Sequence, residues 1–277
     1  MDLSPRTSLF GRYEFVIRRF HSLTGLVPVG GFVIFHLATN ASVLDGPSTF
    51  QSRVDQIHQI GPTTLFMLEW AFIFLPILFH GLIGMAIVIR GKRNLADYPY
   101  TGNFRYTLQR WTGVLAMTFI VWHVFHMHGW FRFEWWAEHV AQPLGGAQFD
   151  PHNAAVTAGA AIFASALMTG FYAAGVLACV YHLANGLWTM GITWGVWTSP
   201  RAQRWANVPC VILGLFVAIV GMGALYGFQR VDRSAPRIPT DHVHRIAEAR
   251  MDGQRPAPSA PLSAGNPDTI SRGRNVR

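Results

Sequence analysis

The sequence predicts an all-α fold, a polytopic bundle of five membrane-spanning helices. Composition is the first reason: 51% of the 277 residues are hydrophobic and only 13% are charged, against about 25% charged in soluble proteins. The second is a series of long uncharged runs, each able to cross a hydrocarbon core of about 30 Å. The third is that basic residues gather between the runs and in the tail. There they act as topology determinants, so the net charge of +8 does not indicate nucleic acid.

Five apolar runs supply the expected spans. The first ends in a turn at residues 45–47, and the second contains Pro76, where we expect a kink. Arginines, including Arg105 and Arg110, crowd the connection before the third run. The fourth is longer than one crossing needs, so tilt, overhang or an interfacial segment must absorb the excess. The runs cover residues 20–44, 63–89, 111–130, 154–197 and 208–228.

The segments between the runs set the expected boundaries and topology. Residues 1–19 form a basic N-terminal segment, 20–229 the five-helix domain, and 230–277 an Arg- and Pro-rich tail that we expect to be disordered. Four basic residues precede the first run, five lie in the second connection and two in the fourth, against one in each alternate connection. The positive-inside rule therefore places the N-terminus in the cytoplasm. The nine arginines of the tail oppose this orientation, but long segments escape the rule.

Histidines recur deep in the apolar runs, one in each of the first four. Lipid offers an imidazole no hydrogen-bond partner, so each ring needs one inside the protein. One such histidine alone is more often a hydrogen-bonded core residue than a ligand, but four in register make a stronger signal. Two facing imidazoles can hold haem iron from both sides. The four residues are His36, His80, His123 and His182.

Depth along the helices sorts these histidines into pairs. At helical rise His36 lies about 25 Å and His123 about 20 Å from the cytoplasmic ends of their spans. His80 lies only about 15 Å in, and His182 falls near the inner interface. Antiparallel helices therefore favour an outer pair, His36 with His123, and an inner pair, His80 with His182. His126 shares a helical face with His123 and could compete with it as the ligand.

Polar residues near the membrane boundaries are candidates for cofactor or quinone contacts. Arg19, His21, Ser22 and Arg110 could bind a haem propionate or a quinone carbonyl, and His21 can equally be a snorkelling interfacial residue. Glu69 is the one acid at appreciable depth, where a proton-handling or quinone role competes with plain burial. Glycines flank the histidines, as a porphyrin pocket requires and as ordinary packing of membrane helices also does.

A set of motifs makes a family resemblance specific. They are Arg18-Arg19-Phe20-His21-Ser22, Phe35-His36-Leu37, Phe74-Leu75-Pro76 with His80-Gly81, Leu108-Gln109-Arg110-Trp111-Thr112-Gly113, Trp122-His123-Val124, His182-Leu183-Ala184-Asn185-Gly186-Leu187-Trp188, Thr193-Trp194-Gly195 and Thr198-Ser199-Pro200-Arg201. Through them, residues 15–228 resemble the cytochrome b membrane anchors of succinate:quinone oxidoreductases. The type is the single-chain, five-helix, two-haem anchor of succinate dehydrogenases and fumarate reductases.

This resemblance implies the cofactors and partners. His36 and His123 would bind a distal haem b, and His80 and His182 a haem b proximal to the iron–sulfur subunit. The chain would lie in a bacterial cytoplasmic (inner) membrane. A flavoprotein and that iron–sulfur subunit would dock on the cytoplasmic face and carry out the succinate chemistry. This chain itself shows neither a flavin-binding glycine fingerprint nor a cysteine set for iron–sulfur clusters. Menaquinone would react near the outer haem.

Residue 180 bears on the direction of the reaction. Di-haem fumarate reductases of the family move a proton through a Glu two residues before the fourth-helix ligand, a position that is Val180 here. Valine carries no proton, which favours succinate oxidation coupled to the membrane potential over fumarate reduction, although Glu69, Tyr181 or water could substitute. Two alternatives stay open: a transporter or quinol-binding anchor without haem, and the di-haem anchor of another dehydrogenase, such as a hydrogenase or formate dehydrogenase.

Overall fold

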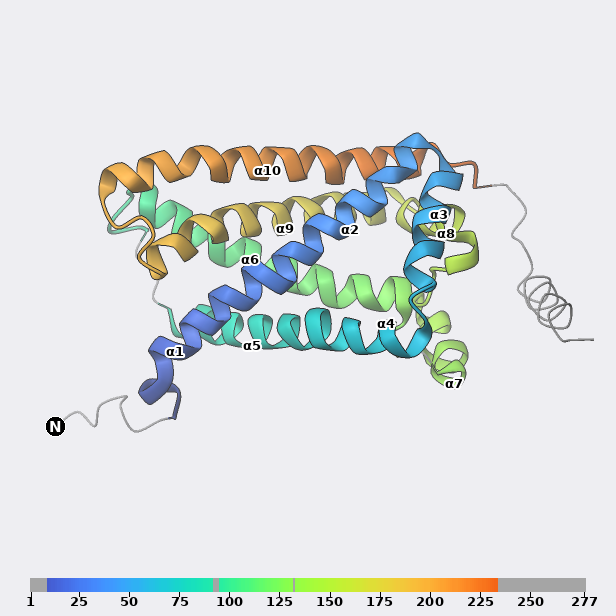
Figure 1. Cartoon of the computed structure of the whole chain (residues 1–277), viewed down its shortest axis with the longest axis horizontal. Helices are drawn as coiled ribbons and strands as arrows, with labels where there is room; N and C mark the ends of the chain where they lie inside the picture. Colours follow the sequence, from blue (N-terminus) through green and yellow to red (C-terminus); the bar gives the residue numbers. More distant parts are fainter. Residues whose placement is uncertain (1–8, 92–94, 132, 234–277) are drawn as a thin grey trace, which may run out of the picture. The chain divides into compact units, whose positions relative to one another are not determined.

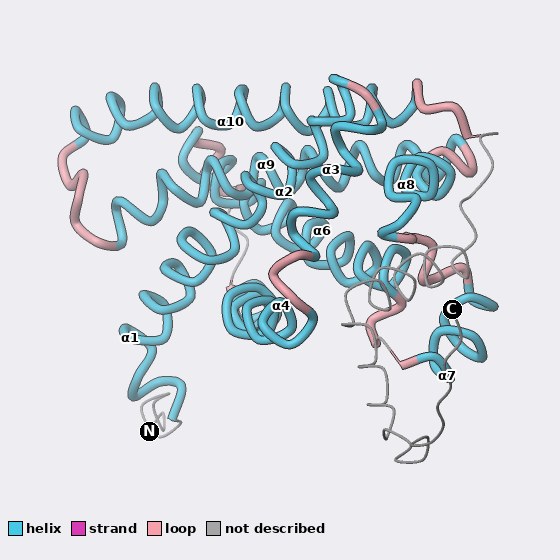
Figure 2. The backbone as a smooth tube through the Cα atoms, turned by 45° about the vertical axis from the view of Figure 1, so that its right-hand side comes forward, coloured by secondary structure: helices cyan, strands magenta, loops and turns pink. Residues whose placement is uncertain are grey.

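The structure, a computed structural model, describes residues 9–91, 95–131 and 133–233. Every regular element in this part of the chain is helical (Figure 2). The chain divides into two units, residues 1–237 and 238–277, and the second lies wholly outside the described residues. We expected the tail, residues 230–277, to be disordered. Beyond Arg233 the tail lies outside the described residues.

The first helical run contains one irregular turn and is followed by a helix that was not expected. α1 (Leu9–Thr24) and α2 (Gly31–Ala41) are joined by a π-helical turn, η2 (Gly25–Gly30), which holds Pro28. Proline cannot donate to an ordinary helical ladder, and a π turn accommodates the defect. At the expected turn, Gly46 has φ 126°, a value that glycine adopts without steric cost. Here, however, the 3-10 turn η3 (Ser42–Asp45) leads through Gly46 into α3 (Pro47–His58).

The second run repeats this pattern, and the third begins earlier than expected. α4 (Pro62–Glu69) and α5 (Leu75–Arg90) are joined by the π-helical turn η4 (Trp70–Phe74), so the irregularity expected at Pro76 lies just before it. α6 (Thr101–His128) starts ten residues before the predicted span. The prediction that Arg105 and Arg110 lie in a connection is therefore wrong, since both are on this helix.

The overlong fourth run is two helices. α8 (Ala154–Ile162) ends before Phe163, and α9 (Ala166–Thr193) begins at the cap Ser165, whose hydroxyl accepts a hydrogen bond from the Met168 amide at 3.1 Å. The excess length is thus absorbed by a separate short helix. The last helix is α10 (Pro200–Gln229). Short elements lie between α6 and α8: α7 (Glu134–Trp136), η5 (Ala137–Ala141), η6 (Gln142–Leu144) and η7 (Pro151–Asn153).

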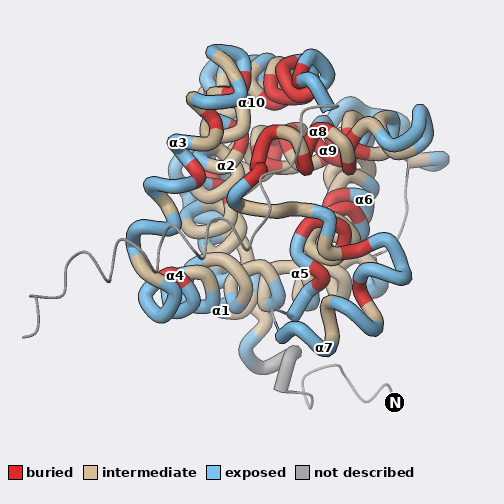
Figure 3. The backbone as a smooth tube through the Cα atoms, turned by 90° about the vertical axis from the view of Figure 1, so that its right-hand side faces the viewer, coloured by how far each residue is buried: buried red, intermediate tan, exposed pale blue. Residues whose placement is uncertain are grey.

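The long helices form the bundle that positions the histidines. Figure 1 shows α5, α6, α9 and α10 running alongside one another, with α1 and α2 crossing them obliquely and α3 lying across one end. Buried residues gather on α8, α9 and the neighbouring parts of α6 and α10 (Figure 3). Among the residues that the structure describes, four helical runs are long and apolar enough to cross a membrane: Tyr13–Asp45, Pro62–Arg90, Ala166–Thr193 and Pro200–Gln229. α6 has comparable length, 28 residues, but its polar residues, histidines among them, lower its hydropathy.

Candidate functional site

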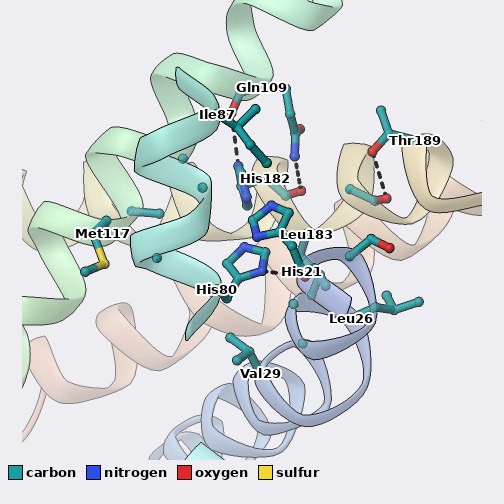
Figure 4. A pocket seen from close by; sticks show the side chains of 18 of the residues that line it. His21, Leu26, Val29, His80, Ile87, Gln109, Met117, His182, Leu183 and Thr189 are labelled. Atoms are coloured by element: carbon teal, nitrogen blue, oxygen red, sulfur yellow. Dashed lines mark hydrogen bonds between the residues drawn. The ribbon is translucent and has the colours of Figure 1, made fainter. Parts of the chain in front are cut away.

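The inner histidines face one another across the bundle. His80 on α5 and His182 on α9 have ring centroids 6.0 Å apart, with their planes at 82°. Both rings point into one cavity between the helices (Figure 4). The structure therefore brings together the two histidines that depth had paired.

Hydrogen bonds to the main chain orient both inner rings. His80 Nδ1 lies 2.9 Å from the carbonyl oxygen of His21, and His182 Nδ1 lies 3.1 Å from that of Gln109. A carbonyl oxygen can only accept, so each Nδ1 carries the proton and donates it. The lone pair of each ring is thereby left on Nε2, the arrangement typical of metal-binding histidines.

Glycines leave room for these rings at two positions. A Cβ at Gly25, in η2, would collide with the His80 imidazole. A Cβ at Gly113 would come 2.8 Å from His182 Cε1, closer than side-chain packing allows. These two glycines therefore serve the histidine pair directly, beyond general helix packing.

A cavity of about 400 Å³ surrounds the inner pair, within the roughly 300–1,000 Å³ range of small-molecule and cofactor sites. Its walls are mostly apolar and come from α1, η2, α5, α6 and α9. The polar lining residues include Arg18, His21 and Ser22 on α1 and Arg110 on α6.

Two of these residues present buried nitrogen atoms to the cavity. His21 stacks on His80, with centroids 4.1 Å apart and planes at 9°. Within the described residues its Nδ1 has no hydrogen-bond partner, and neither has the Nε of Arg110. Buried polar nitrogens of this kind normally find an acceptor, so the inner end of the cavity suits a group bearing oxygen atoms. Arg110 does donate through Nη2 to the Ile87 carbonyl at 3.2 Å.

The outer pair has the same separation in different surroundings. His36 on α2 and His123 on α6 have centroids 6.0 Å apart, with planes at 73°. Asn40 Nδ2 donates to His36 Nε2 at 3.1 Å. The Tyr172 hydroxyl lies 3.4 Å from His123 Nδ1, and Phe119 stacks on the His123 ring at 5.5 Å.

His126, the possible competitor, is engaged elsewhere. Its Nδ1 lies 2.7 Å from the Tyr172 hydroxyl, and its ring stacks on Trp122 with centroids 4.3 Å apart. The side chain is buried, 5% exposed. The ring that faces His36 is that of His123, so the geometry favours His123 over His126 as its partner.

The remaining predicted residues lie in separate places. Ser22 accepts from Trp194 Nε1 at 2.9 Å and donates to the Arg19 carbonyl at 2.9 Å. Arg19 donates to the Thr193 carbonyl at 3.3 Å and covers the Phe15 ring at 4.2 Å. Both therefore help to join α1 to the C-terminal end of α9. Glu69 ends α4 and is not among the residues that line the inner cavity.

Sequence reasoning missed a polar cluster beside His182. Arg105, Gln109 and Asn185 are linked by hydrogen bonds, and Gln109 contacts His182. Gln109 and Asn185 lie within motifs of the family resemblance, whereas Arg105 was interpreted only as a topology determinant. The signal available in the sequence was spacing. Arg105 and Gln109 are four residues apart on α6, and Asn185 follows His182 by three residues on α9.

The histidine pairs fit haem iron. Two imidazoles that share one metal ion through bonds of about 2 Å have ring centres roughly 6 Å apart, and both pairs meet this condition at 6.0 Å. Three further observations at the inner pair fit a haem. They are the free Nε2 atoms of the two rings, the space left by Gly25 and Gly113, and the two nitrogens that have no partner within the described residues.

Comparison with known proteins identifies the family, although no family model matches the chain. The succinate dehydrogenase cytochrome b558 subunit of Bacillus subtilis (strain 168) is 34% identical over 219 residues, which cover 79% of this chain and 98% of the relative. That extent of identity agrees with the all-helical, apolar bundle and with the implied haem b. The chain belongs to the family of succinate dehydrogenase cytochrome b subunits, membrane proteins that associate with the other subunits of that complex.

Proposed function

We propose that the chain is the membrane anchor and transmembrane electron-transfer subunit of a succinate:menaquinone oxidoreductase and holds two b haems. The observation that carries this proposal is the presence of two histidine pairs with the same ring separation, 6.0 Å, at two levels of one helical bundle. His80 and His182 bind the inner haem, and His36 and His123 the outer one. Haem iron supplies one-electron transfer when it is bound.

The chain's own residues hold, orient and shield these groups. The His21 and Gln109 carbonyls accept from Nδ1 of the inner imidazoles, which leaves Nε2 of each ring as the atom that would bind iron. Arg110 Nε and His21 Nδ1, which have no hydrogen-bond partner within the described part of the chain, would be available to propionate carboxylates. Apolar walls from several helices exclude water, which strengthens each of these electrostatic contacts.

The quinone site lies near the outer pair in this proposal. Quinone sites combine apolar walls with a few polar groups, and Thr39, Asn40 and Glu69 are the candidates on the outer half of the bundle. His21 is the inner alternative. Loss of quinone reduction on His21→Ala with both haems retained, and with Thr39, Asn40 and Glu69 variants unaffected, would move the site to the inner side.

The partners are the flavoprotein and iron–sulfur subunits, docked on the basic cytoplasmic face with the N-terminus on the same side. In this arrangement electrons from succinate would pass outward to the quinone. We favour this direction, succinate oxidation, over fumarate reduction. Val180 supports that direction, because it is 4% exposed and packs with Leu37, Val176 and Val217. A side chain in that position offers no proton-carrying group to compensate the charge movement.

The test is haem stoichiometry in the purified complex. We expect two low-spin b haems per chain, one lost on His80→Ala or His182→Ala, and the other lost on His36→Ala or His123→Ala. His126→Ala should keep both haems, since its ring contacts Trp122 and Tyr172. Loss of the outer haem on His126→Ala but not on His123→Ala would show the ligand assignment to be wrong. A complex without haem absorbance would favour the haem-free anchor.

A further inference from the structure

Arg105 is partly buried and is in contact with uncharged side chains. Its Nε donates to Asn185 Oδ1 at 2.8 Å and its Nη1 to Asn207 Oδ1 at 2.6 Å. The guanidinium carbon lies 3.8 Å from the centre of the Trp188 ring, a cation–π contact. Both acceptors are amide oxygens, so these contacts solvate the positive charge without neutralising it.

The hydrogen bonds continue from Asn185 to the inner histidine. Asn185 Nδ2 donates to Gln109 Oε1 at 2.7 Å, and Gln109 Nε2 donates to the His182 carbonyl at 3.1 Å. The Gln109 carbonyl in turn accepts from His182 Nδ1 at 3.1 Å. Gln109 thus holds both the ring and the main chain of His182, and the buried Asn185, 5% exposed, holds Gln109.

We propose that Arg105 is a positioning residue for the inner histidine pair: acting through Asn185 and Gln109, it fixes the orientation of the His182 ring and supplies a positive charge that favours the reduced metal centre. This inference rests on the proposed inner haem. Hydrogen bonds to the outer shell of a ligating histidine set its orientation and basicity, and a nearby positive charge stabilises the form with the less positive iron.

A purely structural role is the competing explanation. The cluster also ties α6 to α9 and α10, because Asn207 lies on α10. Such a tie would change the stability of the complex when it is broken, but would leave the potential and the spectrum of a haem that remains bound. The potential and the electron paramagnetic resonance (EPR) signal of the inner haem therefore separate the two roles.

The experiment compares three variants in the full complex. Arg105→Gln removes the charge, and Arg105→Lys retains it. Arg204→Gln is the matched control, because Arg204 is an exposed arginine one helical turn before Asn207 on α10. Potentiometric titration of both haems and the EPR g values of the inner haem are measured for each.

We expect Arg105→Gln to shift the inner haem about tenfold toward the oxidised form at a given potential, which corresponds to about 59 mV for one electron. Arg105→Lys should recover most of that shift, while Arg204→Gln and the outer haem should change less than twofold. Equal shifts in Arg105→Gln and Arg204→Gln, or no shift in either, overturn the inference.

If Arg105→Gln loses the inner haem, Asn185→Ala is measured instead. That variant keeps the charge of Arg105 and removes the hydrogen bonds that connect Arg105 to Gln109. Altered g values of the inner haem in that variant support the inference, and wild-type values overturn it. His182→Ala distinguishes the two proposals, because retention of both haems there contradicts the proposed function itself. Loss of one haem there, with no Arg105 effect, contradicts only this inference.

Discussion

The inner and outer histidine pairs share a ring separation of 6.0 Å but are held by different kinds of group. Main-chain carbonyls, those of His21 and Gln109, orient the inner rings. Side chains, Asn40 and Tyr172, contact the outer ones. A carbonyl only accepts and so selects one tautomer, whereas a hydroxyl can donate or accept. In the proposed two-haem arrangement the inner rings would bind the metal as they stand, whereas His36 would first have to give up its hydrogen bond from Asn40.

The surroundings of the two pairs differ as well. The inner cavity is lined by Arg18 and Arg110 at its polar end. The outer pair lies among aromatic rings, with Phe32 5.4 Å from His36 and Phe119 5.5 Å from His123. Arginine side chains thus distinguish the surroundings of the inner pair, and phenylalanine rings those of the outer pair.

The largest expected effect tests whether the inner haem depends on a glycine that leaves room for the His80 ring. Gly25→Ala should remove the inner haem and leave the outer, because the added Cβ would collide with the His80 ring. Gly31→Ala, at the start of α2, is the control, because an added Cβ there would meet nothing within 4 Å. Haem per chain and the redox difference spectrum provide the measurement. An inner haem at full occupancy in Gly25→Ala would show that Gly25 does not position His80.

The second prediction sharpens the contrast in charge. The inner haem should have the higher reduction potential, because Arg18 and Arg110 line its cavity and positive charge favours reduced iron. Titration of the wild type and of His80→Ala measures the order. The component missing from His80→Ala should be the high-potential one, and loss of the low-potential component would contradict the assignment.

The third prediction concerns the path between the two pairs. In the proposed function, electrons would pass outward, toward the positive side of the membrane, so the membrane potential would drive the transfer. One charge moved through 100 mV corresponds to about 2.3 kcal/mol. Succinate oxidation with menaquinone in sealed vesicles should therefore slow severalfold when an uncoupler collapses the potential. An unchanged rate would refute the coupling but leave the haem assignment intact.

The smallest expected effect isolates the side-chain support of the outer pair. Tyr172→Phe removes the hydroxyl near His123 and His126, and a hydrogen bond of this kind contributes about 0.5–1.5 kcal/mol. The ratio of oxidised to reduced outer haem at a given potential should change by less than about tenfold. The potential of the inner haem should stay unchanged. Tyr226→Phe, which is 54% exposed on α10, is the matched control. A larger shift at the inner than at the outer haem would contradict this division.

The membrane-spanning helices were predictable from sequence, because a charge-free apolar run long enough to cross the hydrocarbon core directly indicates such a helix. α3 was missed because its polar composition suggested a loop. The available signs were Pro47 in its first turn and the i, i+4 spacing of Phe50 and Val54, both of which are buried. The break before α9 was also missed, although Ser165 is a typical helix cap.

At the site, sequence alone could pair the histidines, because residue count fixes depth along a helix. It could not find the acceptors of the inner Nδ1 protons, since any residue can supply a carbonyl and these two are distant in the chain. Arg105 was hidden for another reason: arginines near helix ends ordinarily determine topology. The axial role of the four histidines stays a prediction.

The helices that carry each pair give an order to biogenesis. Translation completes the outer pair once α6 has been made, whereas His80 must wait for His182 on α9. Haem loaded during synthesis would therefore encounter a finished outer pair first. We expect a membrane-inserted chain arrested at residue 150 to bind one haem with the outer spectrum, and binding of none would mean that the Tyr172 side of α9 is needed before either site forms.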